Sequence, residues 1–244
     1  MCIRDSFQPS GILSRISNAK NALQDAAAFA RQAGDFYEQK VADIYSRYEQ
    51  KLQLNNALDF DDLLMLSIKL LQENKEVREK YQDRFDYLLV DEYQDTNYAQ
   101  HSIVLQLTKE NQRVCVVGDD AQSIYSFRGA DIDNILYFTK IYPNTKVFKL
   151  EQNYRSTQTI VCAANSLIEK NERQIRKAVF SEKEKGEPIG VFQAYSDVEE
   201  GDIVANKIAE LRREYRYGYA DFAILYRTNA QSRIFEAVSY THLR

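Results

Sequence analysis

The sequence predicts an α/β fold in which a parallel sheet carries helices on both faces, preceded by a mostly helical part. Two observations support this prediction. From residue 87 onward, short apolar runs alternate with helical segments, which is typical of parallel strands joined by helical crossovers. Before residue 87, apolar residues recur instead at the spacing of amphipathic helices.

Two helices are predicted in the opening third of the chain. The first spans residues 35–52, with Asp35 as its cap, and has an apolar stripe formed by Tyr37, Val41, Ile44, Tyr48 and Leu52. The second spans residues 59–72, where Asp61 and Asp62 in the first turn favour the helix dipole. The tyrosines of this part, Tyr37, Tyr45 and Tyr48, are interpreted as core residues rather than as a binding surface.

Three strand–helix pairs are predicted next: 87–90 with 98–109, 114–117 with 131–142, and 146–150 with 156–170. A polar cluster follows each strand. These clusters are Asp91-Glu92, Gly118-Asp119-Asp120 and Asn153-Tyr154-Arg155. Because ligands bind at the carboxyl ends of parallel strands, we expect the three clusters to meet at one edge of the sheet. A charged connector at residues 181–188 then leads to a further α/β layer, with strands near 189–194 and 222–226 and a helix near 198–214.

The composition is that of an ordinary soluble globular protein, with 44% hydrophobic and 28% charged residues. No apolar run approaches the roughly 18 residues that span a bilayer, and the amino end has no apolar secretory core. We therefore expect a cytoplasmic protein without membrane contact. The three scattered cysteines and two histidines exclude a zinc knuckle and a Ser-His-Asp triad. A net charge of −4 indicates no global preference for nucleic acid, although a local strip would suffice to bind it.

Two adjacent carboxylates, Asp91 and Glu92, follow the first predicted strand. Such a pair suits a metal–nucleotide site, because one carboxylate can hold Mg²⁺ while its neighbour polarises the attacking water. Exposed acidic pairs are also common in solvated turns, so the pair alone identifies no function. Its interpretation depends on the motifs around it.

Five stretches resemble motifs of superfamily-one DNA helicases of the UvrD/PcrA/Rep family. Residues 91–97 (DEYQDTN) are similar to the second helicase motif, 118–131 (GDDAQSIYSFRGAD) to the third, and 150–156 (LEQNYRS) to the fourth. Two flanking stretches also resemble the family, 57–64 (ALDFDDLL) and 223–233 (AILYRTNAQSR). Their order and spacing agree with the family, and the resemblance covers residues 7–237. Together these motifs are highly specific.

The resemblance implies a RecA-like P-loop NTPase motor domain, an inserted helical subdomain and the start of a second RecA-like domain. Residues 7–56 would belong to the helical subdomain, 57–156 to the C-terminal portion of the first RecA-like domain, and 157–237 to the second. Residues 1–6 and 239–244 join no predicted element, so 1–6 and 238–244 are interpreted as non-native tails. The chain would then be an internal fragment.

The resemblance also implies roles for the residues that match. Asp91 would help to hold Mg²⁺, and Glu92 would be the general base on the hydrolytic water. Gln122 would sense the γ-phosphate of ATP, since an amide both donates and accepts hydrogen bonds. Arg155 would stabilise charge on the transferring phosphoryl group, and Tyr154 would stack on the adenine. Without the motif, Tyr154 would be interpreted as a core aromatic.

The residues that follow Gln122, namely Tyr125, Phe127 and Arg128, lie in a segment that the resemblance places on single-stranded DNA. Each stack of a base on an aromatic ring contributes ~1–3 kcal/mol and tolerates any sequence. One short segment would therefore touch both the γ-phosphate and the DNA, so that hydrolysis could shift the grip on the strand. Family members often carry tryptophan at the position of Phe127. The alternative to a DNA contact is that Phe127 is a buried core residue.

A working ATPase of this type needs a glycine-rich loop that ends in Gly-Lys-Thr or Gly-Lys-Ser. None of the eight glycines is followed by lysine, and the later family motifs are also absent from the sequence. We therefore expect this chain to be inactive alone. The parent protein is predicted to be an ATP-dependent 3′-to-5′ helicase on single-stranded and partly duplex DNA, with repair or replication proteins as candidate partners.

Two alternatives stay open. The scaffold could be a DNA- or partner-binding module that does not hydrolyse ATP, although the presence of Glu92, Gln122 and Arg155 argues against this. It could also be the motor part of a helicase–nuclease of the RecB/AddA type, but residues 127–131 fit the UvrD/PcrA/Rep family better. The sequence on either side of this chain would discriminate among the three hypotheses.

Overall fold

The computed structural model describes residues 7–108 and 112–242. Two compact units make up the chain. The first comprises Met1–Asn153 and Ala164–Phe180, and the second comprises Tyr154–Ala163 and Ser181–Arg244. The expected tail at residues 1–6 lies outside the described residues, as do residues 243–244. Among the described residues, no helix has the length and apolar character needed to cross a membrane.

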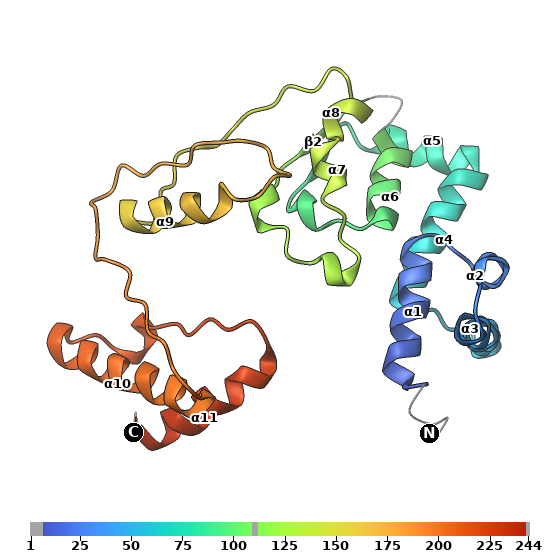
Figure 1. Ribbon diagram of the computed structural model, residues 1–244. Helices are drawn as coiled ribbons and strands as arrows, with labels where there is room; N and C mark the ends of the chain where they lie inside the picture. The colour runs from blue at the N-terminus through green and yellow to red at the C-terminus, as the bar shows by residue number, and fades with distance from the viewer. Residues whose placement is uncertain (1–6, 109–111, 243–244) are drawn as a thin grey trace. The chain divides into compact units, whose positions relative to one another are not determined.

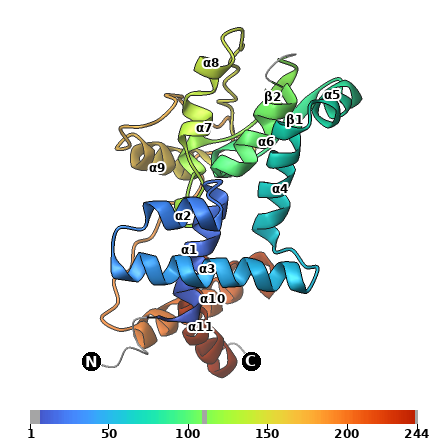
Figure 2. The same cartoon turned by 90° about the vertical axis from the view of Figure 1, so that its right-hand side faces the viewer.

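Five helices open the first unit (Figures 1 and 2). They are α1 (Pro9–Asn21), α2 (Ala26–Gln32), α3 (Phe36–Leu54), α4 (Phe60–Glu73) and α5 (Lys75–Arg84). Asp35 caps α3 by accepting a hydrogen bond from the Glu38 amide, and Asp59 and Asp62 form a reciprocal capping box at the start of α4. Both helices predicted from the sequence are confirmed. In Figure 2, α4 runs from the neighbourhood of α3 towards the strands.

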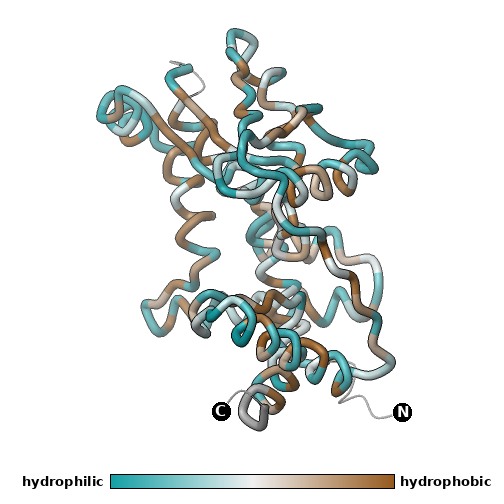
Figure 3. Tube along the Cα trace, turned by 90° about the vertical axis from the view of Figure 1, so that its left-hand side faces the viewer, coloured by the Kyte–Doolittle hydropathy of each residue, from teal (hydrophilic) through white to brown (hydrophobic). Residues whose placement is uncertain are grey.

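A small apolar core joins α1 and α3. It consists of Ile12, Ile16, Ala19, Val41 and Tyr45, against which Phe7, Ala26, Phe29, Tyr37 and Tyr48 pack. The predicted assignment of the tyrosine stripe to the core is therefore confirmed. Hydrophobic and hydrophilic residues alternate along the helices (Figure 3), as expected for elements with one buried face.

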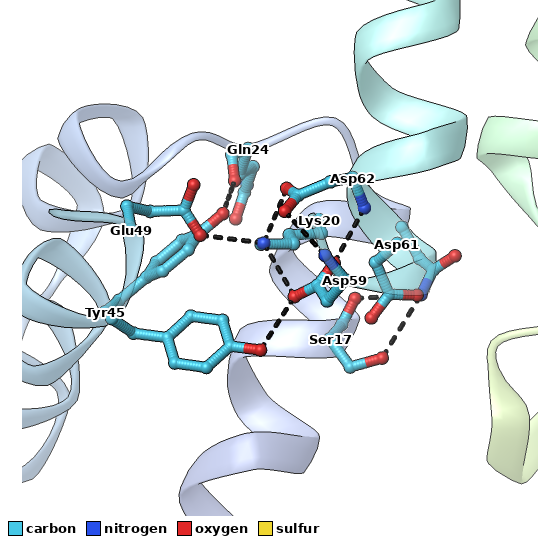
Figure 4. Close-up of polar contacts among 10 residues, drawn as sticks. Ser17, Lys20, Gln24, Tyr45, Glu49, Asp59, Asp61 and Asp62 are labelled. Atoms are coloured by element: carbon cyan, nitrogen blue, oxygen red, sulfur yellow. Dashed lines mark hydrogen bonds and ion pairs between the residues drawn. The ribbon is translucent and has the colours of Figure 1, made fainter. Parts of the chain in front are cut away.

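A buried lysine ties this helical group to α4 (Figure 4). The Lys20 side chain has no exposed surface, and its Nζ lies 2.6 Å from Asp62, 2.7 Å from Glu49 and 2.8 Å from Asp59. The Tyr48 hydroxyl donates to Asp59 as well, at 3.0 Å. Burial would lower the pKa of Lys20, but its hydrogen bonds to the three carboxylates raise that pKa above the ordinary value.

In the described part of the first unit, the sheet has two parallel strands, β1 (Leu88–Val90) and β2 (Val114–Val116). Between and after them lie α6 (Tyr98–Thr108), α7 (Asp133–Leu136) and α8 (Phe138–Ile141), together with the short 3-10 turns Tyr93–Asp95, Asp120–Gln122 and Ser126–Arg128. The core of this layer is formed by Tyr93, Val104, Phe138 and Tyr142, with Leu88, Val90, Val114 and Val116 packed against it. The α/β class, with a small parallel sheet, is confirmed.

Two features of the predicted sheet are wrong. Leu89 and Cys115 alternate with the packed strand residues and are exposed, so the described helices cover only one face of the sheet rather than both. Residues 146–150, 189–194 and 222–226 also form no strand. Phe148, Val191 and Leu225 in these segments are largely exposed. An apolar run becomes a strand only when a neighbouring strand can accept its backbone hydrogen bonds.

The boundary between the two units falls within α9 (Gln158–Ile168), so each unit contains part of that helix. The second unit also contains α10 (Asp197–Tyr215), the 3-10 turn Tyr219–Asp221 and α11 (Asn229–His242). A Cβ at Gly201 would lie 2.9 Å from Val238 and 3.0 Å from Ile234, so the glycine allows α10 and α11 to pack closely. Residues 239–242 continue α11, contrary to the expectation that they join no element.

Candidate functional site

Two of the three predicted polar clusters meet at the carboxyl end of the sheet. Val90 pairs with Val116, and the Val117 amide donates to the Val90 carbonyl at 2.8 Å. The Tyr93 amide in turn donates to the Val117 carbonyl at 3.0 Å. These bonds hold Asp91-Glu92 beside Gly118-Asp119-Asp120, as the order of strands and polar residues predicts.

The backbone of Glu92 has left-handed torsion angles, with φ 50° and ψ 42°. A non-glycine residue in this conformation costs of order 1–3 kcal/mol, and such strain concentrates at functional sites. The Asp91 carboxylate accepts a hydrogen bond from the Glu92 amide at 2.9 Å and so stabilises the bend. Both side chains are exposed at the end of β1.

Gln94 joins the two clusters, and sequence reasoning had assigned it no role. Its side chain is only 1% exposed. The Nε2 group donates to Glu92 Oε2 at 2.8 Å, and Oε1 accepts from the Asp119 amide at 3.0 Å. Gln94 therefore orients the Glu92 carboxylate against the loop that follows β2. A signal was available, because Gln94 lies inside the DEYQDTN stretch and an amide can bridge two partners.

Gly118 allows Gln94 to take this position. A Cβ at Gly118 would lie 2.6 Å from Gln94 Oε1 and 2.8 Å from Ile135 Cδ1. Both distances are too short, so either the Gln94 bridge or the α7 contact must move when a side chain is added.

Gly118→Ala is therefore expected to lower the free energy of unfolding of this chain by about 1–3 kcal/mol, the usual cost of overpacking. This change in the free energy of unfolding is measured by denaturant titration, with circular dichroism as the signal. Gly11→Ala is the matched control, since nothing lies within 4 Å of a Cβ there and alanine has a higher helix propensity than glycine at this exposed position of α1. Equal free energies of unfolding for the two variants would contradict the steric conflict expected at Gly118.

Asp119 organises the short turn that carries Gln122. Its carboxylate accepts from the Ala121 amide at 3.1 Å and from Gln122 Nε2 at 2.8 Å. Lys177, from the part of the first unit that follows α9, contacts both Asp119 and Asp120. Burial would raise the pKa of Asp119, but hydrogen bonds from Lys177 and Gln122 lower it below the ordinary value.

Asp95 is a further carboxylate near Glu92. Burial, and then the negative charge of Glu92, raise the pKa of Asp95 above its ordinary value. A carboxyl group with a raised pKa close to another carboxylate is a common property of functional sites. The sequence placed Asp95 in the motif without distinguishing it.

The aromatic segment after Gln122 is exposed. Phe127 has 65% of its surface exposed, which overturns the alternative that it is buried core. Its ring centroid lies 5.9 Å from that of Tyr125, which is also exposed. The Thr96 carbonyl accepts from the Asp131 amide at 3.0 Å, which ties the end of this segment to the DEYQDTN stretch. The side chain of Arg128 lies outside the described residues.

Tyr154 and Arg155 belong to the second unit. Tyr154 is 75% exposed, so the core interpretation that the sequence allowed without the motif is wrong. Lys183 Nζ donates to the Arg155 carbonyl at 2.9 Å. The expectation that Arg155 meets the other clusters rested on a strand at residues 146–150, which does not form. The role of Arg155 therefore stays a prediction from the motif.

The oxygen ligands at the end of β1 fit a hard cation. Within the described residues, no group of three or more His, Cys, Asp or Glu side chains could hold a metal by itself. Mg²⁺ usually takes one or two protein carboxylates together with phosphate oxygens and water, rather than a complete protein cage. The exposed carboxylates of Asp91 and Glu92 are suitable for that kind of shared coordination.

Comparison with known proteins gives matches over nearly the whole chain. The family profile described as UvrD/REP helicase N-terminal domain matches residues 4–143, and the UvrD-like helicase C-terminal domain matches residues 148–241. The ATP-dependent DNA helicase PcrA of Bacillus subtilis (strain 168) is 50% identical over 230 residues, which cover 94% of this chain and 31% of that protein.

Two further relatives carry the same name. The protein from Leuconostoc citreum is 44% identical over 232 residues, covering 95% of this chain and 31% of the relative. The protein from Staphylococcus aureus (strain Mu50 / ATCC 700699) is 46% identical over 230 residues, covering 94% and 31%. The chain thus spans about a third of the length of these relatives.

Proposed function

Because this chain belongs to the UvrD/REP helicase family, we propose that it carries the hydrolytic part of an ATP-dependent motor that moves along single-stranded DNA and unwinds duplex DNA in the 3′-to-5′ direction. The observation that supports this proposal best is the Glu92–Gln94–Asp119 connection. It joins the carboxylate of Glu92, whose backbone is left-handed, to the turn that carries Gln122.

In the proposed mechanism, Glu92 accepts the proton of the attacking water, and Gln94 keeps its carboxylate pointed in one direction. Asp91 would help to hold Mg²⁺, and the ion would neutralise negative charge on the phosphate oxygens of ATP. Gln122 donates a hydrogen bond to the γ-phosphate, Arg155 stabilises the charge that develops there, and Tyr154 stacks on the adenine. Phosphoryl transfer is catalysed mainly by such positioning and charge stabilisation.

The DNA contact is assigned to Tyr125, Phe127 and Arg128. The exposure of the two aromatic rings suits stacking on bases, which needs no particular sequence. The segment begins three residues after Gln122, and hydrogen bonds of Thr96 hold its far end to the DEYQDTN stretch. A movement of Gln122 on loss of the γ-phosphate would therefore reach the aromatic rings through a few residues.

The test compares this chain alone with a chimera. In the chimera, the matched 230 residues of the Bacillus subtilis relative are replaced by those of this chain. We expect ATP hydrolysis stimulated by single-stranded DNA in the chimera and none in the chain alone, because the chain has no Gly-Lys pair to grip the phosphates.

Turnover by the chain alone, abolished by Glu92→Gln, would contradict the expected inactivity. A folded chimera that binds DNA without hydrolysing ATP would favour the non-hydrolysing module. Nuclease activity of the parent protein would favour the helicase–nuclease alternative.

A further inference from the structure

Residues 169–180, which follow α9 within the first unit, contact the loop after β2 and the start of α7. Arg173 forms an ion pair with Asp133, and the Ile175 amide donates to Asp120 Oδ2 at 2.8 Å. Lys177 Nζ lies 2.5 Å from Asp119 Oδ1 and 3.3 Å from Asp120 Oδ1. None of the helicase motifs that the sequence resembles includes Arg173, Ile175 or Lys177.

Lys177 shares one carboxylate with Gln122. Asp119 Oδ1 receives the Lys177 ammonium, and Asp119 Oδ2 receives Gln122 Nε2 at 2.8 Å. With the Ala121 amide also bonded to Oδ1, the carboxylate is held from both sides. A rotation of Asp119 that moves its carboxylate away from these donors would also remove the hydrogen bond from Gln122 Nε2.

The Lys177 contact differs from an ordinary surface ion pair. The Lys177 side chain is mostly buried, and its second partner, Asp120, is buried. Burial would lower the pKa of Lys177, but its bonds and the charges of Asp119 and Asp120 raise it above the ordinary value. A charged group that is held in this way keeps its partner in one orientation better than an exposed, mobile lysine does.

We propose that Lys177 is a positioning residue, which acts through Asp119 to hold the Gln122 carboxamide where it can meet the γ-phosphate. The proposal rests on the proposed function for the role of Gln122, but the positioning itself is a property of this chain. Removing Lys177 would leave Asp119 held by weaker donors, and Gln122 would then sample several orientations. A misplacement of about 1 Å can cost roughly a hundredfold in rate.

The first experiment measures positioning in the isolated chain. The side-chain amide signal of Gln122 is assigned in an ¹⁵N–¹H spectrum by its loss in Gln122→Glu. In Lys177→Met we expect this signal to move and to exchange faster with solvent, and the titration midpoint of the Asp119 carboxyl to rise. Lys177→Arg, which keeps charge and donors, should restore most of both. Lys149→Met is the control for loss of a lysine in the same unit, because Lys149 Nζ donates to the Arg176 carbonyl and not to a carboxylate of the site.

An unchanged Gln122 signal and Asp119 titration in folded Lys177→Met would overturn the proposal. If Lys177→Met fails to fold, Lys177→Gln provides the same test, since it removes the charge and keeps a donor. These readouts need neither ATP nor DNA, so they decide the positioning role even if the proposed motor function fails.

The second experiment uses the chimera. Lys177→Met is expected to lower kcat for ATP hydrolysis about tenfold, with little change in KM, because orientation rather than binding is lost. Lys177→Arg should recover most of the rate. A rise in KM at unchanged kcat would show that Lys177 contributes to binding instead and would overturn the proposed route through Gln122. A wild-type chimera without turnover would count against the proposed function alone.

Discussion

Glu92→Gln and Arg155→Ala, each made in the chimera, are expected to abolish ATP turnover and to leave the protein in different states. Glu92→Gln removes the base but keeps an oxygen that can accept the 2.8 Å hydrogen bond from Gln94. The site should stay assembled, so ATP still binds and the protein stalls with nucleotide and DNA in place. Loss of a general base typically costs ~10²–10⁴ in rate.

Arg155→Ala removes a cation, so the loss should fall on the transition state and on the preference for ATP over ADP. Removal of an arginine that stabilises phosphoryl transfer can cost ~10³–10⁵ in rate. Phe127→Ala is the contrasting variant. It should spare basal hydrolysis and weaken the stimulation by single-stranded DNA, because stacking is lost while the phosphate site is kept.

Turnover measured against DNA concentration, together with ATP and ADP binding, separates these three outcomes. Full DNA stimulation in Phe127→Ala would show that this exposed ring is not the coupling element. Retained turnover in Glu92→Gln would remove Glu92 from the role of base. Equal affinity for ATP and ADP in wild type and Arg155→Ala would argue against a contact between Arg155 and the γ-phosphate.

Lys20→Met is expected to cause the largest loss of stability. Lys20 is fully buried, and its removal leaves the carboxylates of Asp59 and Asp62 without their cation. Breaking a buried ion pair from one side typically costs about 3–5 kcal/mol. Denaturant unfolding of the isolated chain measures the change, and Lys75→Met is the control. The exposed Lys75–Glu79 pair should contribute at most about 1 kcal/mol.

The same cluster makes stability depend on pH. Burial would raise the pKa of Asp59, but bonds from Lys20, the Asp62 backbone and Tyr48 lower it below the ordinary value. Because its pKa is lowered in the folded state, charged Asp59 stabilises the fold at pH values above the ordinary aspartate pKa. This stability is lost as the pH falls through the pKa of Asp59 in the folded state. The loss in acid should be smaller in Lys20→Met. An identical acid profile for both proteins would show that Lys20 does not hold Asp59 in its charged form.

The sequence by itself determined the features that depend on neighbouring residues. The cap at Asp35, the helices predicted at residues 35–52 and 59–72, and the strands that end before Asp91 and Gly118 all come from local spacing and backbone chemistry. The family resemblance likewise needed only the motifs and their order. These signals are short-range, so no knowledge of the tertiary structure was required to find them.

Only the tertiary structure decided which distant residues meet. Lys177 became a site residue because hydrogen bonding brings it to Asp119, and no spacing in the sequence encodes that contact. Gln94 lies within the DEYQDTN stretch, but only its burial and its bond to the Asp119 amide revealed its bridging role. Residues 146–150 have the composition of a strand and still form none, because a strand depends on a partner elsewhere in the chain. The exposure of Phe127 was decided in the same way, since an aromatic ring is core or surface according to what packs over it.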